Sequence, residues 1–164
     1  MSSKRDNSNK EVSYQEETYD EVIDDIENLI NDHYEEIALY QDKIKLNPNF
    51  DFYKAANENK TLRFYTVRTD DEKYRLVGYT IMLVVQNPHY SDHLFASNDI
   101  IFLDKEYRNL SAGRSLISFS ETKLKEEGVS VISISTKVHQ PFDTLMLSLG
   151  YDCVERNYGK YIGE

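Results

Sequence analysis

The feature that most constrains this chain is a strand–helix–strand pattern across residues 99–138. The apolar run "DIIFLD" predicts a buried strand, and "GRSLISFSETKLKEEG" carries Leu116, Ile117 and Leu124 on one face of a helix. Gly128 suits the end of that helix, and "VSVISISTKV" predicts a second strand. Because a helical crossover returns the chain in the same direction, we expect the two strands to lie parallel in one sheet.

The segments before this pattern predict two helices and a hairpin. Residues 17–44 repeat apolar side chains at steps of three and four, which predicts one long amphipathic helix with an acidic first half. A short second helix is expected after Pro48. Residues 61–69 and 74–86 predict two strands that pair as a hairpin across the polar turn "DDEK".

The segments around and after the crossover complete the expected fold. "NPHYSDH" predicts a polar loop before the strand over residues 94–104. A short helix is expected to begin at Pro141 and end at Gly150, and residues 151–162 predict one or two final strands. The order indicates an α+β fold, with a mixed, mostly antiparallel sheet flanked by helices.

The length of the chain suits one domain preceded by a short tail. The chain has 164 residues, which is typical of a single domain with its own core. Residues 1–16 are rich in Ser, Asn, Lys and Glu and carry few apolar side chains, which predicts a flexible polar tail. The domain is therefore expected over residues 17–164.

Charge and cysteine content limit the partners and the compartment. A formal net charge of −10 disfavours nucleic acid and suits amines, Lys side chains or basic segments, although solubility alone also explains it. The single cysteine, Cys153, excludes an internal disulfide and a cysteine metal cluster, as expected for a reducing cytoplasm. No run approaches the ~20 apolar residues of a membrane span, and the N-terminus lacks an apolar signal core. We expect a cytoplasmic protein.

The turn "KEYRNLSAGRSLI" between the first strand and the helix is a candidate anion site. The first N–H groups of a helix lack internal partners, and small residues let a ligand approach the backbone. Arg108 and Arg114 add positive charge to an otherwise acidic chain. The chain has neither the glycine–lysine loop of P-loop proteins nor the triple-glycine dinucleotide motif. Residues alone leave two readings open: an ordinary turn, or a phosphate cradle.

The segment "IIFLDKEYRNLSAGRSLISFSETKLKEEGV" resembles motif A of the GNAT superfamily of N-acetyltransferases, whose pattern is a strand, then [RQ]-x-x-G-x-[GA], then a helix. Arg108 takes the first position, Ser111 the usual first Gly, and Gly113 the last. "PFDTLMLSLGYDCVERNYGKYI" resembles the closing element of that family. The acidic helix, "LVGY", "NPHY" and "ERNYGK" are similar to a bacteriophage branch of the superfamily.

The resemblance implies a single GNAT-like domain with core motif 99–128, in which acetyl-CoA lies at a splay between two central parallel strands. The pantetheine arm would pair with the backbone of the first strand, and the pyrophosphate would lie on the turn. The implied cofactor-binding residues are Ile101, Phe102, Leu103, Arg108, Asn109, Leu110, Ser111, Ala112, Gly113 and Arg114.

The chain departs from the family pattern at three positions. Ser111 replaces a glycine, and its Cβ restricts the backbone. Met146 stands where many members place a Tyr that protonates the leaving thiolate, and His139 stands where an Asn is usual. The resemblance therefore implies cofactor binding more directly than it implies a particular catalytic acid.

Acetyl transfer to an amine needs a group that removes a proton, because amines are mostly protonated near neutral pH. Asp99 is the candidate base and is expected on the same strand face as Ile101 and Leu103; a structural carboxylate is the alternative. His139 is a candidate proton relay, or else an exposed loop residue. Tyr158 is a candidate acid by position only.

Other histidines have simpler interpretations. His33 lies on the first helix and is expected to be structural. His89, Tyr90 and His93 form either a substrate wall or a solvated loop. His89 and His93 flank Asp92 without a clear third ligand, so no metal site is predicted.

The expected function is an N-acetyltransferase that moves an acetyl group from acetyl-CoA to an amine of a protein or small molecule, by direct transfer in a ternary complex. A basic protein segment is one expected acceptor, and the protein is expected to be a monomer or a homodimer. The alternative is a catalytically weak or inactive CoA-binding or interaction protein of phage origin, in the host cytoplasm.

Overall fold

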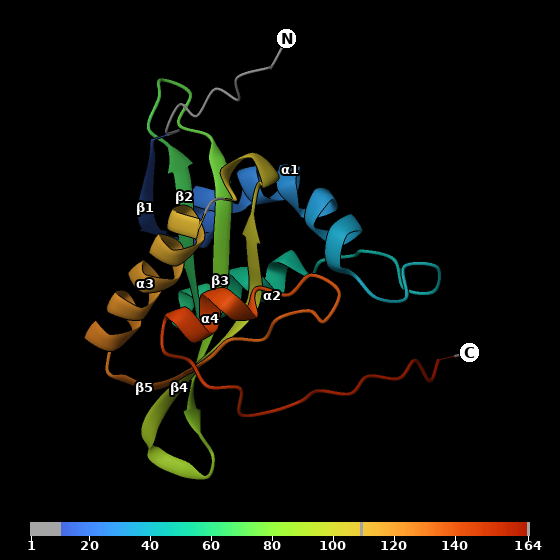
Figure 1. Ribbon diagram of the computed structural model, residues 1–164, viewed down its shortest axis with the longest axis vertical. Helices are drawn as coiled ribbons and strands as arrows, with labels where there is room; N and C mark the ends of the chain where they lie inside the picture. The colour runs from blue at the N-terminus through green and yellow to red at the C-terminus, as the bar shows by residue number, and fades with distance from the viewer. Residues whose placement is uncertain (1–10, 109, 164) are drawn as a thin grey trace.

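A computed structural model describes residues 11–108 and 110–163, except for the side chain of Leu110. Figure 1 shows one central sheet with helices on both faces. The sheet has five strands in the order β1-β2-β3-β4-β5, and only the β4–β5 pair is parallel. The strands are β1 (Val12–Glu17), β2 (Leu62–Thr69), β3 (Leu76–Asn87), β4 (Tyr90–Leu103) and β5 (Val129–Ser133). This is the expected α+β domain with a mixed, mostly antiparallel sheet.

Helices cover the two faces of the sheet separately. Two helices lie on one face and two lie on the other, with a short 3-10 turn between β4 and the first of the second pair (Figure 1). The first pair is α1 (Tyr19–Ile37) and α2 (Phe50–Glu58), the turn is η1 (Lys105–Tyr107), and the second pair is α3 (Leu110–Glu126) and α4 (Asp143–Ser148). Each face therefore has its own apolar core.

The two cores follow from the alternation of side chains along the strands. On the first face, α1 and α2 bury Val22, Ile26 and Ala56 against Phe64 and Phe102 of the sheet. On the second face, apolar side chains of α3 and the sheet form the other core. Its buried members are Tyr65, Val67, Val77, Met82, Val84, Ala96, Tyr107, Leu116 and Leu124. Strands β2 and β3 are apolar on both sides because they contribute to both cores.

The first strand corrects the expected extent of the tail. Residues 12–16 form most of β1, which pairs antiparallel with β2, so the polar tail does not extend to residue 16. Val12 and Tyr14 lie two residues apart and both pack on the α3 core. The Tyr14 ring lies 6.4 Å from that of Phe119. Residues 1–10 of the expected tail lie outside the described residues.

Helix α1 is shorter than its apolar periodicity predicts. It ends at Ile37 and not near residue 44, because the chain turns at Tyr40, whose φ is 60°. The Gln41 side-chain amide donates to the backbone oxygens of Tyr34 and Ala38 at 3.2 and 3.1 Å, so a side chain satisfies the last turn. The short second helix after Pro48 is confirmed as α2.

The hairpin and the end of α3 follow the sequence prediction, whereas the start of β4 and the C-terminal residues do not. The hairpin of β2 with β3 and the end of α3 at Gly128, whose φ is +88°, are as expected. Strand β4 begins at Tyr90, inside the expected polar loop, because the chain turns tightly between Asn87 and Tyr90, which are paired. Residues 151–163 contain no strand, since no other strand of the described chain lies in register beside them.

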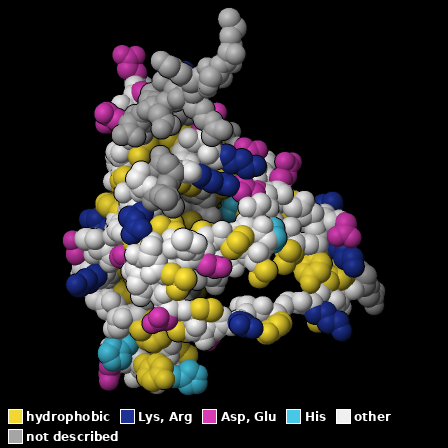
Figure 2. All heavy atoms as spheres, in the orientation of Figure 1, with side chains coloured by type: hydrophobic (Ala, Val, Ile, Leu, Met, Phe, Trp, Pro, Cys, Tyr) yellow, Lys and Arg dark blue, Asp and Glu magenta, His cyan; other side chains and the backbone are white. Residues whose placement is uncertain are grey.

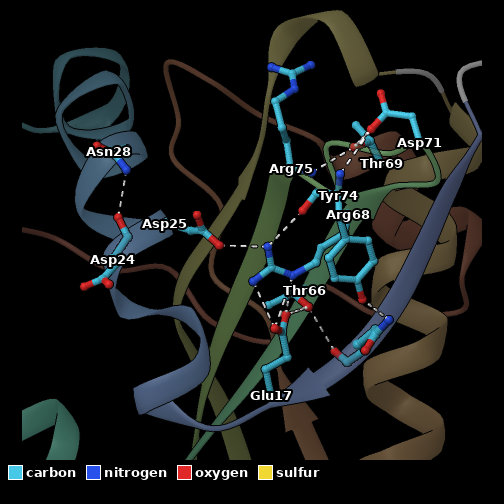
Figure 3. A network of polar contacts seen from close by, with 11 residues as sticks. Glu17, Asp24, Asp25, Asn28, Thr66, Arg68, Thr69, Asp71, Tyr74 and Arg75 are labelled. Carbon is cyan, nitrogen blue, oxygen red and sulfur yellow. Dashed lines mark hydrogen bonds and ion pairs between the residues drawn. The ribbon is translucent and has the colours of Figure 1, made fainter.

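An ion-pair network, drawn in Figure 3, fixes the N-terminal elements to the sheet. The Arg68 guanidinium on β2 lies 2.9 Å from Glu17 at the end of β1 and 2.8 Å from Asp25 on α1. Its side chain is only 5% exposed, so water screens these pairs weakly. The backbone oxygen of Tyr74 also accepts a bond from this guanidinium. One buried arginine therefore joins β1, α1, β2 and the β2–β3 turn.

Candidate functional site

The parallel strands β4 and β5 separate near the middle of β4. Their pairing ends at Ser97 and Ser133. Beyond that point, the Asn98 amide bonds with both backbone groups of Ser135, at 3.2 Å to the oxygen and 2.7 Å from the nitrogen. Further along, β4 pairs in the described structure with β3 alone, as far as Leu103. The β5 side of the strand over Ile101, Phe102 and Leu103 is thus free of a strand partner among the described residues.

A β-bulge at Asp99 changes the expected direction of its side chain. Ile81 pairs with Ile100 and Met82 with Asn98, so Asp99 is an extra residue on β4. Ile101 lines a pocket under α3, whereas Asp99 bonds to Tyr53 on α2. The expectation that Asp99 shares a face with Ile101 and Leu103 is therefore wrong, because the bulge shifts the alternation of side chains by one residue.

Asp99 accepts a hydrogen bond from Tyr53. The Tyr53 hydroxyl lies 2.6 Å from a carboxylate oxygen of Asp99, a short bond typical of a charged acceptor. Burial, and then the bond to Asp99, raises the pKa of Tyr53, so its hydroxyl stays protonated and donates. The sequence pattern does not single out Tyr53, since nothing local distinguishes it among the 13 tyrosines of the chain.

His33 and Tyr79 lie deeper on the same face. The two rings meet edge to face with centroids 6.4 Å apart, and both pack on Phe102. Burial lowers the pKa of His33 to about 4, so the imidazole is neutral near pH 7. His33 Nε2 and the Tyr79 hydroxyl have no hydrogen-bond partner among the described residues. The expected structural role of His33 fits this buried, ring-packed setting.

The start of α3 lies where the anion site is expected. The helix begins at Leu110, directly after η1 and the end of β4, so its first N–H groups lie at the turn. Ala112 is buried and Ser111 is exposed. A Cβ on Gly113 would lie 3.4 Å from Leu145 of α4, which is ordinary contact. Asn109, one of the expected cradle residues, lies outside the described residues.

The two arginines of the turn bind protein groups in this structure. Arg108 forms a bidentate pair with Glu36 of α1 and donates to the Leu103 oxygen at 2.5 Å. Arg114 donates to the Ser148 hydroxyl at 2.7 Å, which links α3 to α4. Figure 2 shows Lys and Arg side chains beside acidic ones over the turn between β4 and α3.

The other expected catalytic residues, His139 and Tyr158, are exposed. His139 is exposed within a tight turn closed by a bridge between Lys137 and Gln140. Tyr158 is 88% exposed. Among the described residues, the bond that Asp99 accepts comes from Tyr53, not from His139 or Tyr158.

A narrow pocket of about 10 Å³, roughly one water in size, lies between α3 and the β4–β5 pair. It is lined mainly by apolar side chains, among them Ile101, Ile117 and Ile132. The Tyr151 hydroxyl is buried there, and burial followed by Glu121 raises its pKa. The pocket lies on the α3 side of β4, opposite the Asp99–Tyr53 bond.

The described residues show neither a membrane helix nor a metal cluster. None of the described helices combines the length and the apolar content needed to cross a bilayer. Within residues 11–108 and 110–163, no three His, Cys, Asp or Glu side chains gather as metal ligands would.

Comparison with known proteins defines the class. The model of the Acetyltransferase (GNAT) family matches residues 15–151, which is most of the chain. The chain therefore belongs to the GNAT family of acetyltransferases. No curated protein sequence matches it.

Solved structures share the fold at low sequence identity. A ribosomal-protein-alanine N-acetyltransferase from Brucella melitensis biovar Abortus 2308 is 16% identical, with a TM-score of 0.68 over 93% of this chain and 100% of that one. An aminoglycoside acetyltransferase from an uncultured soil metagenomic sample, in complex with sisomicin, is 10% identical, with a TM-score of 0.69 over 93% and 95%. A predicted acetyltransferase from Clostridium acetobutylicum, with acetyl-CoA, is 8% identical, with a TM-score of 0.69 over 92% and 96%.

Proposed function

We propose that the protein transfers an acetyl group from acetyl-CoA to an amine by direct transfer in a ternary complex. The observation that carries this proposal is the bulge that holds the Asp99 carboxylate where β4 and β5 separate, on the strand that leads into α3. The candidate base on β4 and the candidate phosphate site at the start of α3 are thereby linked by one short turn. In this proposal the cofactor occupies the gap on the β5 side of Ile101, Phe102 and Leu103, with its phosphates at residues 110–114.

The chemistry requires a neutral amine and a proton acceptor. The Asp99 carboxylate takes a proton from the ammonium form, directly or through a water. The neutral amine nitrogen then forms a bond to the thioester carbon, and the carbon–sulfur bond breaks. The nitrogen gives its second proton to water as the amide forms, and the thiolate leaves and takes up one proton. His139 and Tyr158 are the candidate sources of that proton. Tyr53 holds the carboxylate through its 2.6 Å bond.

The acceptor that we propose is cationic. The net charge of −10 favours an approaching ammonium group over an anion. Two structural neighbours are named for amine acceptors, an aminoglycoside and a ribosomal-protein alanine, which suggests both small molecules and polypeptides as probes. The amine panel should therefore include an aminoglycoside, a peptide with N-terminal Ala, and a Lys-rich peptide.

Thermal unfolding and thiol release test the proposal in sequence. Acetyl-CoA at 100 times its Kd should stabilise the fold by about 2.7 kcal/mol, seen as a rise in Tm. Thiol release should then appear with at least one amine of the panel. Asp99→Asn should keep the Tm shift and lower kcat about 100-fold. The proposal fails if millimolar acetyl-CoA leaves Tm unchanged.

Substitution at Gly113 tests whether the phosphates lie at the start of α3. Gly113→Glu places a negative charge and bulk in the first helical turn and should abolish the acetyl-CoA shift. Gly113→Ala is the matched control, since its Cβ meets Leu145 at 3.4 Å, and the shift should persist. An intact shift in Gly113→Glu would place the phosphates elsewhere.

A second candidate function is binding with weak or no turnover, as in an interaction protein of phage origin acting in the host cytoplasm. Met146 favours it, because a buried thioether 7% exposed offers no proton to a leaving thiolate. An acetyl-CoA-dependent Tm shift with no thiol release from any amine of the panel would select this candidate.

A further inference from the structure

The Arg108 side chain, expected at the pyrophosphate, uses one N–H donor of each of its three nitrogens to bond protein atoms. Its Nη2 donates to Glu36 at 2.8 Å, its Nη1 bonds the other oxygen of the same carboxylate, and its Nε donates to the Leu103 oxygen at 2.5 Å. The guanidinium also lies 5.8 Å from the centre of the Phe102 ring. The side chain therefore points back to the end of β4 and to α1.

Glu36 is nearly buried beside the Arg108 guanidinium and is charged. Its side chain is 9% exposed, and the Arg108 bond, the largest cause, lowers its pKa, so the carboxylate is charged. Lys105 approaches the same carboxylate at 3.9 Å. A bidentate pair between a carboxylate and an arginine has fixed geometry, which resists rotation better than a single bond.

Helix α1 has a second anchor one turn earlier. His33 packs on the Phe102 ring, with centroids 5.2 Å apart, three residues before Glu36. The C-terminal half of α1 thus contacts the end of β4 at two points. His33 packs on the Phe102 ring, and Glu36 pairs with Arg108, which bonds the Leu103 oxygen. The turn between β4 and α3 is therefore fixed by α1, which lies on the face of the sheet opposite to α3.

We propose that Glu36 is a positioning residue of the turn between β4 and α3, which we call the cofactor turn. Glu36 holds the Arg108 side chain so that it links α1 to the end of β4 and acts as a strut. In this arrangement the phosphates of acetyl-CoA are received by the backbone N–H groups at the start of α3, and Arg108 does not contact them. The inference rests on the proposed function, because it concerns the same site.

Exchanging the charges of Glu36 and Arg108 distinguishes two roles for Arg108: positioning the turn, or binding the phosphates directly. Glu36→Gln and Arg108→Gln should each weaken acetyl-CoA binding, on the order of tenfold in Kd by calorimetry, because either loses the pair. The double variant Glu36→Arg with Arg108→Glu restores an ion pair and should recover most of the affinity. If Arg108 contacts the phosphates directly, the double variant places a carboxylate there and stays as weak as Arg108→Gln, which would overturn the inference.

Glu17→Gln is the matched control. The Glu17 side chain is 12% exposed, close to the 9% of Glu36, and pairs with Arg68 at 2.9 Å. This variant should lower Tm but leave the acetyl-CoA Kd of the folded protein unchanged. A tighter Kd in Glu36→Gln would also overturn the inference, since it would mean that Glu36 competes with the phosphates for Arg108.

A measurement on the wild-type protein tests the same inference if the variants fail to fold. The Arg108 Nε–H signal in ¹⁵N NMR should stay in place as acetyl-CoA is added, because its bond to Leu103 persists. A large shift of this signal, together with shifts of the α3 N-terminal amides, would mean that Arg108 moves onto the phosphates. Absence of any shift or heat with wild-type protein would contradict the proposed function instead, so the two failures are distinguishable.

Discussion

Helix α1 is held to the sheet by arginine ion pairs at both ends, and the two ends differ in what else they touch. Near its start, Arg68 is 5% exposed at its side chain and joins Glu17, which is 12% exposed, and Asp25, which is 45% exposed. Near its end, Arg108 is 35% exposed and pairs with Glu36 beside the turn before α3. Similar chemistry thus serves stability alone at one end and, in our proposal, the geometry of a ligand site at the other.

The comparison teaches that burial of an ion pair does not reveal its purpose. The Arg68 network contains no residue of the candidate site, whereas Glu36 pairs with Arg108 in the turn between β4 and α3. Variants at the two ends should therefore separate effects on unfolding from effects on ligand binding. The following expectations run from the largest effect to the smallest.

Loss of Arg68 should give the largest change in stability. Arg68→Met leaves Glu17 without its partner in a nearly buried position and should lower the free energy of unfolding by about 3 kcal/mol. Denaturant titration at pH 7 measures this loss. The acetyl-CoA Kd of the folded fraction should not change; a weaker Kd would show that both ends of α1 serve the site.

His33, near the C-terminal end of α1, should make stability depend on pH. Its pKa is lowered from 6.5 to about 4 by burial, so the unfolded chain binds a proton that the folded chain does not over this range. Stability should fall as pH drops from about 6.5 to about 4, by about 3 kcal/mol from this group.

His33→Leu is the test of that pH dependence, because it removes the titrating ring and keeps an apolar side chain of similar reach. The difference in unfolding free energy between wild type and variant should change with pH over the same window and be constant above it. A constant difference throughout would mean that His33 titrates normally in the folded protein.

Removal of the Tyr53 hydroxyl should change the free energy of unfolding least among these variants, and it should lower the rate of acetyl transfer. Tyr53→Phe loses one hydrogen bond to a partly exposed carboxylate, which costs about 1 kcal/mol or less. We expect kcat/KM to fall about tenfold with acetyl-CoA affinity unchanged, because Asp99 loses its orienting donor.

Tyr65→Phe is the control for that change. The Tyr65 hydroxyl lies in the α3 core and has no hydrogen-bond partner among the described residues, so its removal should leave turnover intact. Equal losses in Tyr53→Phe and Tyr65→Phe would indicate a general packing effect and not a role for the Asp99 bond.

The sequence by itself determined the class and several of the elements. Apolar periodicity predicted α3 and the β2–β3 hairpin, and the break at Pro48 predicted α2, because period and turn chemistry are local properties. The crossover predicted the parallel β4–β5 pair, and the turn before α3 predicted a helix N-terminus at the expected phosphate site. The GNAT resemblance, read from the same residues, agrees with the family match over residues 15–151.

Only the tertiary structure decided which side chains meet. The bulge at Asp99 depends on how β4 pairs with β3, and strict alternation along one strand cannot show it. The partners Tyr53 and Glu36 come from helices 46 and 72 residues away from Asp99 and Arg108 in sequence. Contacts at such separations are set by packing of whole elements, so local pattern carries no signal for them. The early end of α1 likewise followed from a side-chain bond of Gln41, not from periodicity.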